Sequence, residues 1–205
     1  MLYLIGGVAS YLIGSLSFAY IISRIMRLPN PTDYGSGNAG ATNVLRTGNK
    51  KAAYLVLIGD LMKGFLVVLA AQQYSFYAHD PNVLIGVSAV FVFLGHLFPV
   101  FFSFKGGKGV ATSAGILLAL EFTIGLLAIT VWLFVAFLTR YSSLAALMAA
   151  FVSFVTTFVM AISLPIVLSI SCIFILILVR HKQNIKQLIT GDESKISFSS
   201  SSSGK

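Results

Sequence analysis

The chain has 205 residues, of which 57% are apolar and only 10% charged, and its mean hydropathy is +0.92. Soluble domains carry about 25% charged residues, so the composition excludes an ordinary soluble enzyme, a disordered chain and a disulfide scaffold, and predicts an all-α integral membrane protein. The formal net charge is +8. Membrane proteins collect Lys and Arg on the cytoplasmic side, and no nucleic-acid-binding motif accompanies the charge. We therefore expect membrane lipid as a partner and no nucleic acid.

Apolar runs predict most of the membrane spans directly. A spanning helix needs about 20 apolar residues. The runs that best fit this requirement are 2–22, 52–71, 82–102, 144–162 and 165–179. Arg24 and Arg27 follow the first run at once, which places its end in the cytoplasm and the N-terminus outside.

The run 110–139 is either one long tilted helix or two helices that meet near Glu121. Two crossings leave only His79, Asp80 and Glu121 as charged or titratable loop residues outside, with no Lys or Arg. We therefore predict a bundle of seven transmembrane helices with the N-terminus outside and the C-terminus in the cytoplasm. The helix 110–120 would cover about 16 Å, so it should be short and sheltered by its neighbours, or the membrane should thin around it.

One charged pair, Asp60 and Lys63, lies inside a predicted span. The two residues are at i and i+3 on one helix face, so they can neutralise each other. An ionisable residue within a membrane indicates function by default, although a purely structural pair that fixes helix packing is an equal alternative.

The predicted organisation is a single membrane-embedded catalytic domain over 1–193 and a disordered tail over 194–205. The tail contains the serine run 199–203, which is typical of an expression remnant. Before it, Ile185, Leu188 and Ile189 share one face of a short amphipathic helix expected on the membrane surface.

Four polar segments fall on the inside in this topology, and the first is the glycine-rich loop 35–46. Glycines let successive N–H groups form a concavity that binds anions, and an arginine supplies a planar fork suited to phosphate. The Lys-Ser/Thr spacing of a P-loop is missing, and a plain turn-rich connector is the alternative. The residues predicted to bind phosphate here are Ser36, Gly37, Asn38, Gly40, Thr42, Asn43 and Arg46.

The second segment, 95–113, places two lysines around a glycine pair at the start of a helix. A helix N-terminus adds partial positive charge and free N–H groups, so the segment predicts a phosphate site. Simple positive-inside anchoring is the alternative, but anchoring does not require three glycines. His96 fits either the site or helix packing. The residues predicted here are His96, Lys105, Gly106, Gly107, Lys108 and Thr112.

The third and fourth segments are 140–143 and 181–193. Ser142 and Ser143 follow an arginine and a tyrosine, and the alternative is a capping turn in which Ser143 caps the next helix. His181 and Asn184 are at i and i+3 and face the same way, and a histidine can exchange protons with a hydroxyl. The few inside acids and the missing Cys/His cluster predict no metal and no cofactor.

Two of these segments carry long patterns that resemble the bacterial acyl-phosphate–glycerol-3-phosphate acyltransferase family. The family pattern Gly-Ser-Gly-Asn-Pro-Gly-Ala-Thr-Asn is matched by 35–43, with Ala39 in place of proline. The patterns Gly-His-x-Phe-Pro and Phe-Lys-Gly-Gly-Lys-Gly-Val-Ala-Thr are matched by 95–99 and 104–112. The second of these motifs is long and specific.

The other two segments extend the resemblance over about residues 1–193. Arg-Tyr-Ser-Ser is found at 140–143, and His-x-x-Asn-Ile…Gly-x-Glu begins at His181 and ends at Glu193. Gln187 stands where the family often has arginine. The resemblance implies a multi-pass enzyme of the bacterial cytoplasmic (inner) membrane whose active site faces the cytoplasm.

The reaction that the resemblance implies joins an acyl phosphate to sn-glycerol 3-phosphate and yields lysophosphatidic acid and phosphate. Both substrates carry phosphate, which suits two basic, glycine-rich loops. The predicted catalytic residues are Lys105, Ser142, His181 and Asn184, with Glu193 among the binding residues. We expect proton removal from the acceptor hydroxyl to be partly substrate-assisted. The alternative function is an organic-phosphate transporter or channel.

Overall fold

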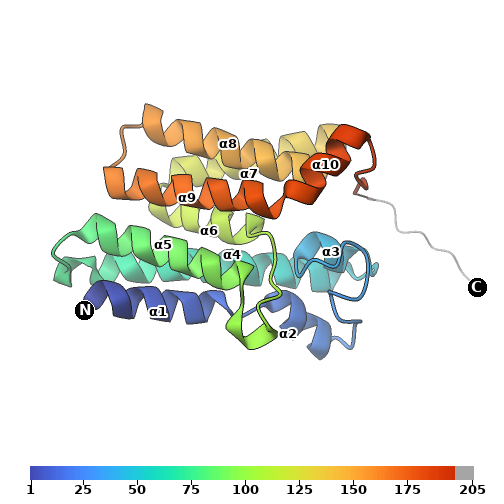
Figure 1. Cartoon of the computed structure of the whole chain (residues 1–205), viewed down its shortest axis with the longest axis horizontal. Coiled ribbons are helices and arrows are strands. Elements are labelled where there is room, and N and C mark those ends of the chain that lie inside the picture. Colours follow the sequence, from blue (N-terminus) through green and yellow to red (C-terminus); the bar gives the residue numbers. More distant parts are fainter. Residues whose placement is uncertain (197–205) are drawn as a thin grey trace, which may run out of the picture.

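The computed structural model describes residues 1–196 and is helical, without strands, over that part of the chain. The serine run 199–203 of the expected tail lies outside the described residues. The elements in chain order are α1 (Leu2–Gly14), α2 (Phe18–Ile25), α3 (Ala41–Leu45), α4 (Lys50–Tyr74), η1 (Ser75–Tyr77), α5 (Pro81–Leu97), η2 (Val100–Phe102), α6 (Val110–Leu120), α7 (Phe122–Thr139), α8 (Ser142–Val159), α9 (Leu164–Arg180) and α10 (Lys182–Thr190). The long helices run side by side, and α2, α3 and α10 gather at the end of the bundle away from the N-terminus (Figure 1).

The predicted membrane character of the bundle is confirmed. Among residues 1–196, five stretches are long and apolar enough to cross a bilayer, and a sixth is found if α9 and α10, which are bent by 55°, are counted together. The five are Leu2–Ile25, Lys50–Tyr77, Pro81–Phe102, Phe122–Thr139 and Ser142–Val159. With 11 residues, α6 is too short to be counted among them.

The first predicted span is not one continuous helix, because α1 ends at Gly14 and α2 begins at Phe18. At the break, Lys63 Nζ donates to the carbonyl oxygens of Gly14 and Leu16, both at 2.9 Å. Carbonyl groups released from a helix within a membrane must find other donors. Lys63 on α4 therefore supplies the hydrogen-bond donors that the broken helix no longer provides.

The run 110–139 forms two helices separated at Glu121, as predicted, and the shorter one packs closely on its neighbours. A Cβ on Gly115 would lie 2.0 Å from the Leu61 carbonyl oxygen, and a Cβ on Gly64 would lie 2.4 Å from that of Thr112. Small residues let helix backbones in membranes approach to this degree. The close contact with α4 shelters α6, as its length required.

The larger core cluster lies between α4, α5, α6, α7 and α9 and reaches the polar end of the bundle. Phe93 is fully buried there. Gly109 has a φ of +83°, and a Cβ on it would lie 2.2 Å from the Phe93 ring. The core therefore fixes the position at which the polar loop after α5 turns into α6.

Candidate active site

The four polar segments meet at one end of the bundle, where hydrogen bonds join residues that are far apart in the sequence. The hydroxyl groups of Thr42 and Ser142 are 3.2 Å apart, which links α3 to the start of α8. Lys108 Nζ donates to Asn184 Oδ1 at 2.6 Å, which links the loop before α6 to α10. The Ser143 hydroxyl donates to Glu193 and so joins the two pairs, which makes one polar cluster of residues from all four segments.

The first glycine loop is held in shape by Asn43. Its Oδ1 accepts from the Ser36 N–H at 2.9 Å, and its Nδ2 donates to the carbonyl oxygens of Pro31 and Tyr34 at 2.7 and 3.2 Å. Asn43 is buried, so its amide braces the loop from inside, and its predicted contact with phosphate competes with this structural role. Gly37 has a φ of +64°, in the left-handed region, and it is exposed to solvent.

The second loop is held by Arg180, the last residue of α9. Arg180 Nη2 donates to the carbonyl oxygens of Gly106 at 3.1 Å and Gly107 at 3.0 Å. Its guanidinium also lies 5.6 Å from the centroid of the Phe98 ring. In a trans peptide the N–H points opposite to the preceding C=O. Because Arg180 binds the Gly107 carbonyl oxygen, the Lys108 N–H of the same peptide points away from the guanidinium.

Lys108, Asn184, Glu193 and Ser143 form a continuous chain of polar contacts. Asn184 Nδ2 donates to both carboxylate oxygens of Glu193 at 2.9 and 3.1 Å, and Ser143 Oγ donates to Glu193 Oε1 at 2.5 Å. Burial holds the pKa of Lys108 below its usual value, although Glu193 opposes this effect. The capping interpretation of Ser143 is wrong: α8 begins at Ser142, and the Ser143 hydroxyl bonds to Glu193 instead of a backbone amide.

His181, which follows the end of α9, is a neutral imidazole. It is buried, and its Nδ1 lies 2.9 Å from the Ile177 carbonyl oxygen. Because a carbonyl can only accept, Nδ1 carries the proton and Nε2 keeps a lone pair. Burial lowers the pKa of His181 to about 4. The ring can therefore accept a hydrogen bond from a hydroxyl, but at neutral pH it offers no positive charge to a phosphate.

Two predicted binding residues lie beneath the site. Thr112 is 0% exposed, inside the contact of α6 with α4. Its predicted contact with substrate is therefore closed off by packing. His96 is buried at the end of α5, and its Nδ1 lies 3.4 Å from Asp60 Oδ1. The Nδ1 side of the His96 ring therefore faces the protein interior, which favours a role in helix packing.

The other basic residues are open to solvent. Lys105 and Arg46 are both exposed, and Arg46 Nη2 donates to Ser194 Oγ at 3.2 Å. The segment after α10 crosses this end of the bundle, where the Ile196 N–H donates to the Arg140 carbonyl oxygen at 2.7 Å. Exposed cations beside the half-buried Lys108 form a basic surface at the end of an apolar bundle, which suits an anionic headgroup with an apolar tail.

Arg180 is the residue of this cluster that sequence reasoning did not select. Its position directly before His181 was the available signal, because it brings a planar fork to the same helix end. The partners of that fork are backbone carbonyls 73 and 74 residues away in the sequence. A pattern of side chains does not reveal such a contact.

Together, the bundle and this basic cluster define a helical membrane protein that handles phosphate-bearing molecules. The family profile described as "Glycerol-3-phosphate acyltransferase" matches residues 4–191. The chain belongs to the glycerol-3-phosphate acyltransferase family. This membership favours the enzyme over the transporter or channel interpretation.

Curated relatives of the same name match nearly the whole chain. One from Cupriavidus pinatubonensis is 53% identical over 94% of this chain and 96% of its own, and one from Paraburkholderia phymatum is 52% identical over 94% and 92%. A crystal structure of PlsY (YgiH), an integral membrane glycerol 3-phosphate acyltransferase, in its glycerol 3-phosphate form has a TM-score of 0.89 and 36% identity over 95% of this chain and 96% of that one. Its lysophosphatidic acid form has a TM-score of 0.86.

Proposed function

We propose that this protein transfers the acyl group of an acyl phosphate to the 1-hydroxyl of sn-glycerol 3-phosphate. The hydroxyl oxygen attacks the acyl carbonyl, the bond between the carbonyl carbon and the phosphate oxygen breaks, and inorganic phosphate leaves. The observation that carries the proposal is the convergence of Arg46, Lys108, Ser142 and Asn184 from four distant segments at one end of an apolar bundle. Phosphate binds at that end while the acyl chain stays in contact with lipid.

The residues divide into those that bind phosphate and those that orient the acceptor. Lys105, Lys108 and Arg46 supply positive charge, and charge-assisted hydrogen bonds are the strong ones. Ser142 and Asn184 supply neutral hydrogen-bonding groups for the glycerol part. His181 accepts a hydrogen bond from the acceptor hydroxyl through Nε2.

The proton of that hydroxyl passes to a phosphate oxygen of a substrate. A phosphate monoester has its second pKa near 6, whereas burial lowers the pKa of His181 to about 4. Burial thus makes His181 a weak base, which leaves a phosphate oxygen of a substrate to take the proton. The mixed anhydride carries its own good leaving group, so position and positive charge supply the rest of the catalysis.

The topology belongs to the same proposal. Seven crossings, with the short α6 as one of them, put the polar end of the bundle in the cytoplasm and the N-terminus outside, at the bacterial inner membrane. Cys172 is the only cysteine. Single cysteines at His79 and Gln187 in a Cys172→Ser background therefore test the orientation with an impermeant maleimide. Labelling of Gln187→Cys but not His79→Cys on intact cells would overturn it.

The activity itself is tested with the purified protein in detergent. Acyl phosphate and glycerol 3-phosphate should yield lysophosphatidic acid and inorganic phosphate in equal amounts, and acyl thioesters should not replace the acyl phosphate. Transport needs two compartments, whereas this chemistry does not. Absence of turnover in detergent, with uptake of glycerol 3-phosphate by proteoliposomes, would replace the enzyme with a transporter.

A further inference from the structure

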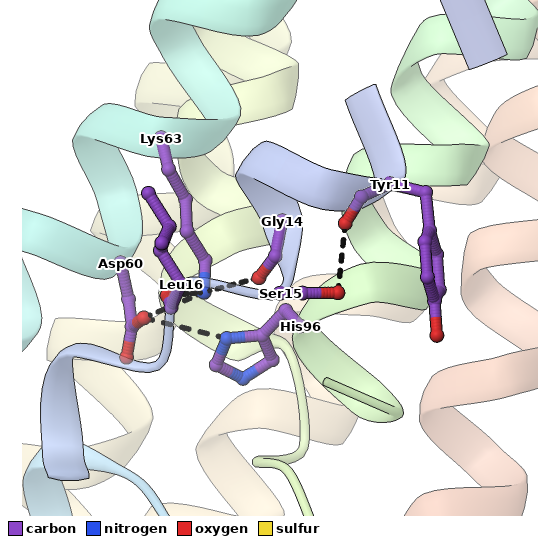
Figure 2. A network of polar contacts seen from close by, with 7 residues as sticks. All are labelled: Tyr11, Gly14, Ser15, Leu16, Asp60, Lys63 and His96. Carbon is purple, nitrogen blue, oxygen red and sulfur yellow. Dashed lines mark hydrogen bonds and ion pairs between the residues drawn. The ribbon is translucent and has the colours of Figure 1, made fainter. Parts of the chain in front are cut away.

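A buried charged network lies directly beneath the polar end of the bundle. Lys63 Nζ and Asp60 Oδ1 are 2.9 Å apart, and His96 Nδ1 lies 3.4 Å from the same carboxylate oxygen. Each of these residues is at most 5% exposed. Figure 2 shows them converging from α4 and α5 on the break between α1 and α2. A buried ion pair often stabilises a fold no more than an apolar pair of the same volume does. Its presence here therefore calls for a role other than stability.

On one side, the network is fixed to the broken first span. Lys63 Nζ donates to the carbonyl oxygens of Gly14 and Leu16. The Ser15 side chain between them donates to the Tyr11 carbonyl oxygen and accepts from the Val100 N–H at 3.3 Å (Figure 2 shows the first of these bonds). The break in the first span therefore anchors both the network and the segment that follows α5.

On the other side, the network supports the second glycine loop. The Gly107 N–H donates to the His96 carbonyl oxygen at 3.2 Å. A Cβ on Gly107 would lie 2.3 Å from His96 Nε2 and 2.8 Å from the Ala39 carbonyl oxygen. Gly107 is thus held between the imidazole ring and the first glycine loop. A shift of His96 would move the turn that carries Lys108.

We propose that Asp60, Lys63 and His96 act as a positioning unit that fixes the Gly106-Gly107-Lys108 turn for substrate phosphate. The unit touches no substrate. Asp60 orients the His96 ring, Lys63 holds Asp60 against the break in the first span, and the ring and carbonyl group of His96 hold Gly107. The inference rests on the proposed function, because it assumes that Lys108 binds a substrate phosphate.

A double-mutant cycle between Asp60 and Lys108 tests the unit in the purified full chain. Lys108→Ala should lower kcat/KM about tenfold to a hundredfold, and Asp60→Asn should lower it about tenfold on its own. If Asp60 acts through the turn, Asp60→Asn should cost less than about threefold once Lys108 is alanine, because effects that share one path do not multiply. Melting temperatures monitor folding separately.

Gln72→Ala is the matched control on the same helix. Gln72 Nε2 donates to the Ala119 carbonyl oxygen at 2.8 Å, so its loss weakens helix packing about 18 Å from Asp60. It should lower the melting temperature and leave kcat/KM unchanged. If Lys108→Ala is fully active, the phosphate assignment fails. If Lys108→Ala is impaired but the two losses multiply in full, or Asp60→Asn is harmless, the positioning unit is overturned.

Substitutions at His96 keep the test decisive if Asp60→Asn does not fold. His96→Asn keeps a side-chain donor near the place of Nδ1, whereas His96→Leu removes it, and both keep the backbone carbonyl that binds Gly107. His96→Leu should raise the KM of a phosphate-bearing substrate at least fivefold more than His96→Asn does. Equal KM values in two folded variants would contradict the role of the contact between ring and carboxylate.

Discussion

Lys108 Nζ and Asn184 Oδ1 are 2.6 Å apart although 76 residues separate them in the sequence. The contact ties the turn at the start of α6 to the short helix α10. Asn184 also donates to the Glu193 carboxylate, so its amide lies between a cation and an anion and bonds to both.

The first prediction concerns the exposed cations. Lys105→Ala and Arg46→Ala should each lower kcat/KM about tenfold to a hundredfold, because each loses a charge-assisted bond worth roughly 1.5–3 kcal/mol. Steady-state kinetics of the purified variants measure this. Lys186→Ala is the control, since Lys186 is also basic and exposed but lies on α10. A loss in the control as large as in the two variants would point to a general effect of surface charge.

The second prediction concerns turnover without His181. His181→Ala should raise the KM of glycerol 3-phosphate and leave measurable turnover when the acceptor is saturating, since the phosphate takes the proton. An essential base usually costs about 10²–10⁴ in rate when removed. Normal binding of both substrates with turnover about 10⁴-fold slower would make His181 the base.

The burial of His181 also predicts a pH dependence of stability. Burial lowers the pKa of His181 to about 4 in the folded protein, whereas an unfolded chain has a histidine pKa of about 6.5. The unfolded state therefore binds the proton first, and the stability that neutral His181 contributes is lost as the pH falls from about 6.5 to 4. The melting temperature in detergent should fall over this range, and less steeply in His181→Gln. Parallel curves for the two proteins would contradict this.

A fourth prediction separates the two substrates. Ser142→Ala should raise the KM of glycerol 3-phosphate about tenfold and that of acyl phosphate little, because the proposed function assigns the hydroxyl to the glycerol part. Ser153→Ala removes a hydroxyl from the same helix, where it donates to the Ala149 carbonyl oxygen, and should change neither KM. An increase in the donor KM alone would mean that the two substrate positions are exchanged.

A fifth prediction concerns Arg180, whose fork holds the glycine pair. Arg180→Lys keeps the charge but loses the planar geometry, so kcat/KM should fall about tenfold. The competitive inhibition constant of inorganic phosphate should rise with it. Lys182→Ala, in the exposed basic residue two positions on, should change neither value. Unaltered kinetics in Arg180→Lys would show that the turn keeps its shape without the two hydrogen bonds.

The sequence was sufficient for most of the membrane-spanning stretches and for the segments that form the site. Apolar length and charge asymmetry are properties of the chain itself, and they predict the split at Glu121 and the short α6. The shared apolar face of Ile185, Leu188 and Ile189 likewise predicts the helix α10. Glycine-rich turns with basic residues indicate anion binding wherever they occur. These properties are local, and no knowledge of neighbours is needed to read them.

Other features depend on what packs against a residue. The break at Gly14 is stabilised by a lysine on α4, and the bond of Ser143 to Glu193 follows from the path of the chain after α10. Thr112 belongs to the same motif as Lys108, yet helix packing buries it completely. Sequence determines which groups are able to bind phosphate, because chemical type is a property of the residue. Only the tertiary structure decides which of them remain free to do so, because burial and competing partners come from segments far away in the chain.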